Sequence, residues 1–336
     1  MTLFNKHIEK FALGAGQRAY RGTLHVGLVN NMPDTALRAT ELQFARLLKD
    51  ASGVLDVQLR LFSLPQIQRG ELVRSRMEGF YADADTLPTS GIDALIVTGA
   101  EPCADGLRQE NYWDALAHLV DWAEIGTLSS LFSCLAAHAA VEHLSGIVRQ
   151  KLPRKLSGVF AVDRASHDPL LTGMPAQIRV PHSRRNTLAE SDLAAKDYCV
   201  LSRLESGGVD SFARAMPGRS LFLFLQGHPE YGAQTLGREY LRDMGRFLRG
   251  ECAERPAIPE QYFDRATEKA LAALDDESQG PDDWARYSGI VSGALPLQSW
   301  RGHAIKLFGN WLALIAAEKM RRLTQNRPTA RKQLRA

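Results

Sequence analysis

Short apolar runs alternate with amphipathic stretches through the first half of the chain. The runs at residues 24–30, 92–98 and 128–132 read as buried parallel strands, and residues 54–62 alternate with a period of two, as a half-buried strand does. Apolar residues recur at helical spacing in three further stretches, residues 37–48, 112–125 and 135–144. Because strands and helices alternate in short units, the pattern predicts an α/β fold with a mostly parallel sheet and helices on both faces.

The second half has a different pattern, in which Gly and Pro separate several apolar runs. Strands are predicted there at residues 156–162, 177–181, 198–204, 209–215 and 220–224. A loop is expected at 227–231, an amphipathic helix at 236–248 and a final helix at 307–320. The polar stretch 65–88 is expected to form an irregular helical excursion.

The predicted elements divide the chain into one main domain and several added segments. The expected segments are an N-terminal extension at 1–23, the main domain at 24–250, a Pro/Asp-rich insertion at 251–298, a C-terminal helix of the same domain at 299–320 and a disordered basic tail at 321–336. Within the insertion, residues 275–283 are expected to be mobile. A chain of 336 residues is long enough for such an arrangement.

Composition excludes several classes of protein. Lys and Arg number 41 against 38 Asp and Glu, and this balance argues against nucleic acid as the main partner. The sequence lacks an apolar run of the roughly 18–20 residues that a membrane helix needs, and residues 1–11 lack the apolar core of a secretory signal. Cys103, Cys134, Cys199 and Cys252 form no CxxC pair. We therefore expect free thiols in a reducing, cytoplasmic location.

Segment 129–138 places a cysteine where an apolar run ends and an Ala-rich helix begins. At such a turn the side chain stands at the carboxyl edge of a parallel sheet, beside the backbone N–H groups that open the helix. A helix N-terminus also favours the thiolate, which is the reactive form of cysteine. Cys134 is therefore a candidate nucleophile. A buried structural cysteine is the alternative that this segment leaves open.

His228 and Glu230 lie two residues apart, directly after the apolar run that ends at residue 225. Side chains two apart on a strand point the same way. In a Cys–His–acid arrangement the imidazole takes the thiol proton and the carboxylate orients the ring. The pair by itself also fits a solvated loop, whereas its combination with Cys134 indicates nucleophilic catalysis.

Motifs along residues 24–315 carry a resemblance to a known family. They are NNMP at 30–33, TELQFARLL at 40–48, VTGA at 97–100, YW at 112–113, FSC at 132–134, KLSGV at 155–159, PHS at 181–183, GHPEYGAQTL at 227–236, YLRD at 240–243 and SWRGHAIKLFGNWL at 299–312. In this order they resemble the homoserine O-succinyltransferase (homoserine transsuccinylase) family. The resemblance implies a class I glutamine-amidotransferase-like, flavodoxin-like fold, so that residues 24–250 form an amidotransferase-like acyltransferase domain.

The resemblance also implies a reaction and its central residues. In this family acyl-CoA acylates a cysteine, and the acyl group then passes to the side-chain hydroxyl of homoserine, a step of methionine biosynthesis. By position, Cys134 is the nucleophile, His228 the base and Glu230 the carboxylate that orients it. Succinyl-CoA or acetyl-CoA is a co-substrate, no cofactor is expected to stay bound, and a homodimer is implied.

Further residues fall at the family's substrate contacts. Arg242 falls where the family binds the amino-acid carboxylate, a group that suits the arginine fork. Lys155 and Ser183 fall at other substrate contacts. An oxyanion hole is expected from the Leu135 N–H and the backbone near Ala100. The alternatives are a surface salt bridge for the arginine, a solvated lysine and a turn-capping serine.

Three positions depart from the family pattern. Residues 34–39 form a longer segment without the expected lysine, for which Arg38 is a possible substitute. Cys103 stands at the acyl-donor selector, commonly Gly for succinyl and Glu for acetyl, and so leaves the donor open. His138 occupies a position where the family has Gln. Serine therefore stays open as an alternative acceptor.

Two other functions compete with acyl transfer. A glutaminase could use the same three residues, but the G-x-C-x-G-x-Q surround of such enzymes is missing around Cys134. A binding protein without activity is the non-enzyme alternative, and the joint presence of all three residues argues against it. The nine His are scattered and no phosphate-binding loop is found, so neither a metal nor a nucleotide cofactor is expected.

Overall fold

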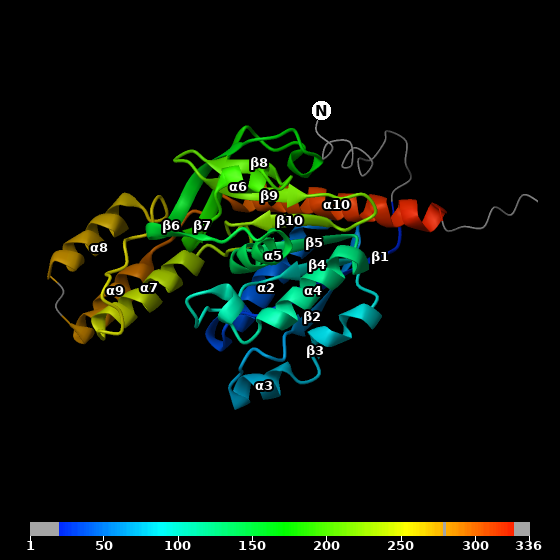
Figure 1. Cartoon of the computed structure of the whole chain (residues 1–336). Coiled ribbons are helices and arrows are strands. Elements are labelled where there is room, and N and C mark those ends of the chain that lie inside the picture. The colour runs from blue at the N-terminus through cyan, green and yellow to red at the C-terminus, as the bar shows by residue number, and fades with distance from the viewer. Residues whose placement is uncertain (1–19, 278–279, 326–336) are drawn as a thin grey trace, which may run out of the picture.

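A ten-stranded sheet forms the centre of the computed structural model, which describes residues 20–277 and 280–325 (Figure 1). The strand order is β3-β2-β1-β4-β5-β10-β9-β8-β6-β7. The strands are β1 (Thr23–Val29), β2 (Asp56–Ser63), β3 (Tyr81–Asp83), β4 (Ala94–Val97), β5 (Ser129–Ser133), β6 (Gln150–Arg164), β7 (Gln177–Thr187), β8 (Cys199–Leu204), β9 (Val209–Arg214) and β10 (Leu221–Leu225).

The sheet has a parallel half and an antiparallel half that meet at β10. From β3 to β10 in the spatial order, neighbouring strands pair in parallel. From β10 to β7 every pair is antiparallel. Parallel neighbours need crossover connections, which the helices of the first half supply, whereas the Gly/Pro turns of the second half suit antiparallel neighbours. The expected α/β sheet with a large parallel part is confirmed.

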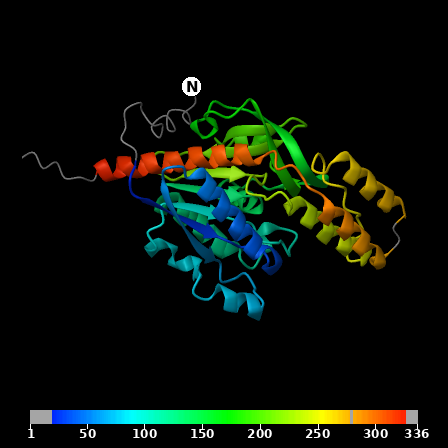
Figure 2. The same cartoon turned by 180° about the vertical axis from the view of Figure 1, so that it is seen from behind.

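Helices cover both faces of the sheet. They are α2 (Asp34–Ala51), α3 (Glu71–Met77), α4 (Trp113–Gly126), α5 (Leu135–Ser145), α6 (Glu190–Ala194), α7 (Thr235–Leu248), α8 (Arg265–Glu277), α9 (Trp284–Gly293) and α10 (Arg301–Gln325). Figure 2 shows α2 and α10 side by side on one face, and α4 and α5 lie on the other, toward the viewer in Figure 1. Leu131 belongs to the core under α2 and α10, and its neighbour Phe132 belongs to the core under α4 and α5. This alternation is the period of two expected of a strand buried on both sides.

A third apolar cluster lies beyond the end of the sheet, among α7, α8 and α9. Tyr240, Tyr287 and Trp300 are buried in it. The insertion expected at 251–298 is therefore largely helical and packs against α7. Of its stretch expected to be mobile, residues 278–279 lie outside the described residues.

Two expectations need correction. The polar stretch 65–88 contains not only helical turns but also strand β3, which extends the sheet beside β2. The last helix continues to Gln325, so the prediction that the tail begins at 321 is wrong for its first five residues. The extra turn is stabilised because Arg321 and Arg322 both bind the carboxylate of Glu318, one turn earlier, at 2.6 and 2.8 Å. Residues 1–19 and 326–336 of the two expected terminal segments lie outside the described part. Among the described helices, none has both the length and the apolar character needed to cross a membrane.

Candidate active site

Cys134 connects β5 to α5 in a strained backbone conformation. Its φ of 50° and ψ of −109° lie in a region that residues other than glycine seldom adopt. The Cys134 N–H donates to the carbonyl of Leu225 on β10 at 2.7 Å, and its own carbonyl accepts the first hydrogen bond of α5 from Ala137 at 3.0 Å. The parallel pairing of β5 with β10 and the first turn of α5 together hold the strained residue. This is the sharp turn that the sequence predicts, with the partly buried thiol at the carboxyl edge of the sheet.

The backbone after β4 packs closely against the start of α5. A Cβ added at Gly99 would lie 2.6 Å from Cβ of Leu135 and 3.4 Å from the backbone N of Ala136. Only glycine fits there, and Ala100 follows it, partly buried against the same cluster. The two segments predicted to form the oxyanion hole are thus adjacent.

His228 and Glu230 form a hydrogen-bonded pair in the loop after β10. Nδ1 of His228 and Oε1 of Glu230 are 2.8 Å apart, and both residues are buried. The loop is held because the His228 N–H donates to the carbonyl of Pro181 at 2.7 Å and the imidazole stacks on Tyr231, with ring centroids 4.3 Å apart. Two segments far apart in sequence therefore fix the position of the ring.

The charge of the imidazole depends on both of its partners. Burial lowers the pKa of His228, and the charges of Glu230 and Cys134 outweigh it, so that the pKa lies well above its usual value. Nδ1 faces the carboxylate, and Cys134 interacts with the same ring through charge and hydrogen bonding. The structure thus brings together the cysteine, histidine and glutamate that the sequence singles out. The raised pKa of His228 suits an imidazolium held between an acid and a candidate nucleophile.

Lys155 and Arg242 meet at one carboxylate, that of Asp243 on α7. Nζ of Lys155 donates to Oδ2 at 2.7 Å and Nε of Arg242 donates to Oδ1 at 2.9 Å. The two cations outweigh burial and lower the pKa of Asp243. Arg246, one turn further along α7, lies 3.5 Å from Glu101 in the loop after β4, so this charged cluster adjoins the segment that packs on α5.

Three further expected residues are Ser183, Cys103 and Arg38. Ser183 is partly buried on β7, opposite Ser157 of β6. Cys103 has an exposed side chain, and its backbone N–H donates to Glu110 at 2.8 Å. Arg38 is exposed and binds Glu41 on the surface of α2 at 2.6 Å.

Arg69 binds the turn that precedes α2, and the segment that departs from the family pattern, residues 34–39, forms the start of that helix. Arg69 has a side chain only 4% exposed, and it donates to the carbonyls of Asn30 and Met32 and pairs with Asp34 at 3.3 Å. The role of Arg38 as a possible substitute for the missing lysine stays a prediction.

His138 connects α5 to the segment that follows β10, where His228 and Glu230 lie. Its Nε2 lies 2.8 Å from Oε1 of Gln226, and the same oxygen accepts the Leu188 N–H at 3.1 Å. The Gln226 amide nitrogen donates to Val209. These backbone partners fix the orientation of the amide, so His138 donates from Nε2. Burial lowers its pKa to about 4, which keeps the ring neutral at pH 7.

Three buried polar residues near the site have no counterpart in the sequence-based assignment. They are His182 and Arg184 on β7 and Asp210 on β9, each between 0% and 5% exposed. The motif PHS at 181–183 includes His182 and ends one residue before Arg184. A charged residue two positions from a histidine, just beyond the strand predicted at 177–181, was the available signal, because side chains two apart on a strand point the same way.

Comparison with known proteins agrees with the family resemblance that the motifs carry. The model of the family described as homoserine O-succinyltransferase matches residues 6–321. The chain is similar to a homoserine O-succinyltransferase of Rhodopseudomonas palustris, 48% identical over 94% of this chain and 96% of that one. It is also similar to one of Methylorubrum extorquens, 49% identical over 87% of each chain.

Among solved structures, a glutamine amidotransferase of Methylobacillus flagellatus is similar over 87% of this chain and 94% of that one. With 13% identity and a TM-score of 0.46, this likeness is too low to support a conclusion. The family match spans both the Cys134 turn and the loop of His228 and Glu230, and the identity to the named relatives is high over nearly the whole chain. The chain belongs to the homoserine O-succinyltransferase family.

Proposed function

We propose that this protein transfers a succinyl group from succinyl-CoA to the side-chain hydroxyl of homoserine through a thioester on Cys134. The observation that carries the proposal is the convergence of Cys134 with the hydrogen-bonded pair of His228 and Glu230 in a chain of this family. The donor is the one for which the similar enzymes of Rhodopseudomonas palustris and Methylorubrum extorquens are named. The exposed Cys103 at the selector position is smaller than the Glu typical of acetyl donors.

The first half-reaction would load the enzyme. The Cys134 thiolate attacks the thioester carbonyl, the new C–S bond forms, and the bond to the CoA sulfur breaks. The departing CoA takes the proton of the His228 imidazolium and leaves as the free thiol. Backbone N–H groups at Leu135 and near Ala100 would meet the oxyanion of the tetrahedral intermediate.

The second half-reaction would transfer the succinyl group from Cys134 to homoserine. Neutral His228 takes the hydroxyl proton of homoserine as the oxygen attacks the thioester, and the C–S bond breaks to restore the thiolate and the imidazolium. Glu230 holds the ring in orientation throughout. Arg242 would bind the carboxylate of the amino acid, with Lys155 beside it on Asp243.

A substrate panel tests the proposal. The protein is incubated with succinyl-CoA or acetyl-CoA, each with homoserine or serine, and free CoA is measured; glutamine alone, with ammonia measured, is the glutaminase arm. We expect fastest CoA release with succinyl-CoA and homoserine. Faster release with acetyl-CoA or with serine would replace the donor or the acceptor, and ammonia release without acyl transfer would make the protein a glutaminase.

We also infer a cytoplasmic homodimer that uses acyl-CoA as a co-substrate, without a bound metal, cofactor, nucleic acid or membrane partner. The near balance of charge is the observation that argues against a nucleic-acid partner. Light scattering at several protein concentrations checks the dimer, and a monomer at all of them would exclude it.

A further inference from the structure

The loop that carries His228 binds the free edge of β7. This strand is the last in the order of the sheet, so one of its edges has no partner strand. On that edge the carbonyl of Pro181 accepts the His228 N–H at 2.7 Å. Proline has no N–H of its own, so the edge leaves no donor unpaired at this position. The loop after β10 therefore connects the two ends of the antiparallel half, β10 and β7.

A buried acid–imidazole pair lies directly under this loop. It consists of Asp210 on β9, which is 5% exposed, and His182 on β7, which is 0% exposed. Oδ1 of Asp210 and Nε2 of His182 are 3.1 Å apart. Removing a carboxylate and an imidazole from water is costly unless each meets a partner. Apolar side chains would fill the same space at a lower cost, so packing alone does not explain the pair.

Each member of the pair is also held from its far side. Nε of Arg184 donates to Nδ1 of His182 at 3.3 Å, so the proton of the neutral ring sits on Nε2, on the side of Asp210. Oδ2 of Asp210 accepts from Oγ of Ser202 at 2.6 Å, and Ser202 is hydrogen-bonded to Ser211. Buried polar groups that have their partners form rigid networks. The two atoms that face the loop, Oδ1 and Nε2, are therefore fixed in place.

Gly227 lies against these two atoms. A Cβ added at Gly227 would lie 2.7 Å from Oδ1 of Asp210 and 2.9 Å from Nε2 of His182, so a side chain would push the loop away. The preceding residue is held by the same strand, because the Gln226 N–H donates to the carbonyl of Asp210 at 2.8 Å. The main chain just before His228 thus depends on both members of the pair.

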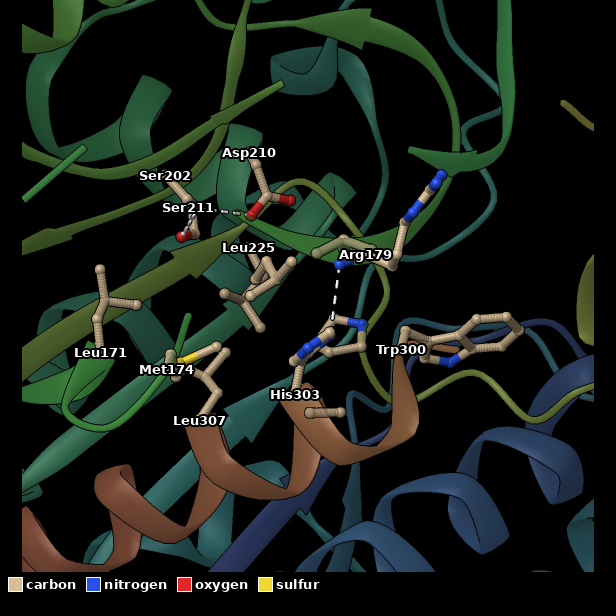
Figure 3. A pocket seen from close by; sticks show the side chains of 14 residues that line it. Leu171, Met174, Arg179, Ser202, Asp210, Ser211, Leu225, Trp300, His303 and Leu307 are labelled. Atoms are coloured by element: carbon tan, nitrogen blue, oxygen red, sulfur yellow. Dashed lines mark hydrogen bonds between the residues drawn. The ribbon is translucent and has the colours of Figure 1, made fainter. Parts of the chain in front are cut away.

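Close packing does not hold the loop from behind. Figure 3 shows Asp210 on the wall of a cavity of about 20 Å³ that faces His303 of α10. Pro229, the neighbour of His228, lines the same cavity. The cavity has room for about one water and is too small for a substrate. Side chains therefore do not fill the space behind Pro229, and the contacts just described support the loop on this side.

We propose that His182 and Asp210 are positioning residues of the catalytic base. They hold Gly227, and with it the main chain of His228, in one place. The imidazole thereby keeps its 2.8 Å hydrogen bond to Glu230 and its place in the site. His228 remains the group that moves the proton, and neither positioning residue touches substrate. The inference rests on the proposed function in taking His228 as the base of acyl transfer.

The first test compares two variants of His182. His182→Leu removes the ring that faces Gly227 and its contact with Asp210, so kcat for succinyl transfer should fall by about 10–10²-fold, as for a group displaced by about 1 Å. The KM values for homoserine and succinyl-CoA should stay unchanged, because a displaced base slows both half-reactions and touches neither binding site. His182→Gln keeps an N–H group that can face Asp210 and should restore most of kcat.

This comparison distinguishes positioning from a structural role. A residue that only stabilises the fold would lower the free energy of unfolding in urea and leave kcat of the folded protein as in the wild type. A wild-type kcat in folded His182→Leu, or equal kcat values for the leucine and glutamine variants, overturns the inference.

Gly227→Ala decides the question even where His182→Leu does not fold. It leaves the pair in place and puts a methyl group against it, so kcat should fall with unchanged KM, and a wild-type kcat would contradict the inference. His143→Leu is the matched control, because it removes another imidazole–carboxylate pair, that of His143 on α5 with the exposed Asp121 on α4 at 2.7 Å. It should keep the wild-type kcat, and a loss equal to that of His182→Leu would overturn the inference.

Amide hydrogen exchange of the peptide that contains residues 226–231, followed by mass spectrometry, needs no substrate. Exchange should be faster in His182→Leu and Gly227→Ala than in the wild type, because the His228 N–H is no longer held on Pro181. A protein that transfers succinyl groups but shows wild-type exchange and kcat in both variants keeps the proposed function and loses this inference. One that shows the faster exchange but is inactive with all substrates of the panel loses the proposed function alone.

Discussion

The two halves of the sheet supply different kinds of groups to the site. The parallel half presents Cys134 through backbone geometry: a strained residue between β5 and α5, fixed by main-chain hydrogen bonds. The antiparallel half presents charged side chains, Lys155 from β6 and Arg184 from β7, fixed by ion pairs and hydrogen bonds to other side chains. His228 follows β10, the strand that belongs to both halves.

The difference shows how a common architecture can acquire a particular reaction. A strand–turn–helix unit at the edge of a parallel sheet is a general way to expose a nucleophile. What such a nucleophile does depends on the charges around it, and here these come from strands and helices with no fixed relation to the turn. Substitution of Cys134 in the parallel half should therefore abolish chemistry, whereas substitution of the charged residues around it should change affinity or pH dependence.

Cys134→Ala should have the largest effect. Loss of the sulfur removes the covalent step, so turnover should vanish, and Cys134→Ser should be inactive too. The fold should persist, because a partly buried thiol contributes little to packing. Intact mass after incubation with succinyl-CoA alone should show a succinyl adduct on the wild type and none on Cys134→Ala. A near-normal rate in Cys134→Ala would exclude the thioester route.

His228→Ala and Glu230→Ala should be unequal. Loss of the base should reduce kcat by roughly 10²–10⁴-fold, the usual contribution of a positioned base. Glu230 orients His228 at 2.8 Å and stabilises its charged form, so its loss should cost less. Steady-state rates of both variants at saturating substrates decide the order. An active His228→Ala beside an inactive Glu230→Ala would reverse the two roles.

Arg242→Lys separates acceptor binding from acyl loading. A lysine cannot reproduce the two-donor fork, so the KM for homoserine should rise strongly. Thioester formation on Cys134 should hardly change, because loading precedes acceptor binding. Mass spectrometry follows the acylation of Cys134, and CoA release with homoserine present follows the transfer to the acceptor. Equal slowing of both half-reactions would place Arg242 at the donor site or in support of the fold through Asp243.

His138→Gln should have the smallest effect on activity, because a glutamine can also donate to Gln226. Its effect should appear in the pH dependence of stability. Burial lowers the pKa of His138 from 6.5 to about 4. Between pH 6.5 and pH 4 the unfolded chain therefore binds a proton that the folded chain does not. The stability of the wild type falls as the pH drops through this range. Between pH 7 and pH 4.5 the free energy of unfolding of the variant should therefore fall by about 2 kcal/mol less than that of the wild type.

The free energy of unfolding in urea at pH 7 and at pH 4.5 measures this difference. The other titrating groups are common to both proteins, so only the difference between the two curves matters. Parallel curves for the wild type and the variant would mean that His138 is not held neutral.

Much of the parallel half could be predicted from the sequence. Apolar runs mark β1, β4 and β5 to within two residues at each end, because strands buried on both faces leave an unbroken apolar signature. The site residues Cys134, His228 and Glu230 could also be named, since each sits beside such a run and belongs to a motif. Strand β3 was missed because three residues at a sheet edge leave hardly any pattern.

The chain alone therefore determined the order of the elements, the candidate nucleophile and its candidate acid–base pair, because these depend on local periodicity and on short motifs. Only the tertiary structure decided which charges surround them. His182 and Asp210 are 28 positions apart and lie on strands that do not pair with each other, yet their side chains are 3.1 Å apart in the folded chain. Contacts between distant strands depend on the order and register of the sheet. Burial decides which of those contacts matter for the free energy, because a charge removed from water must find its partner inside the protein.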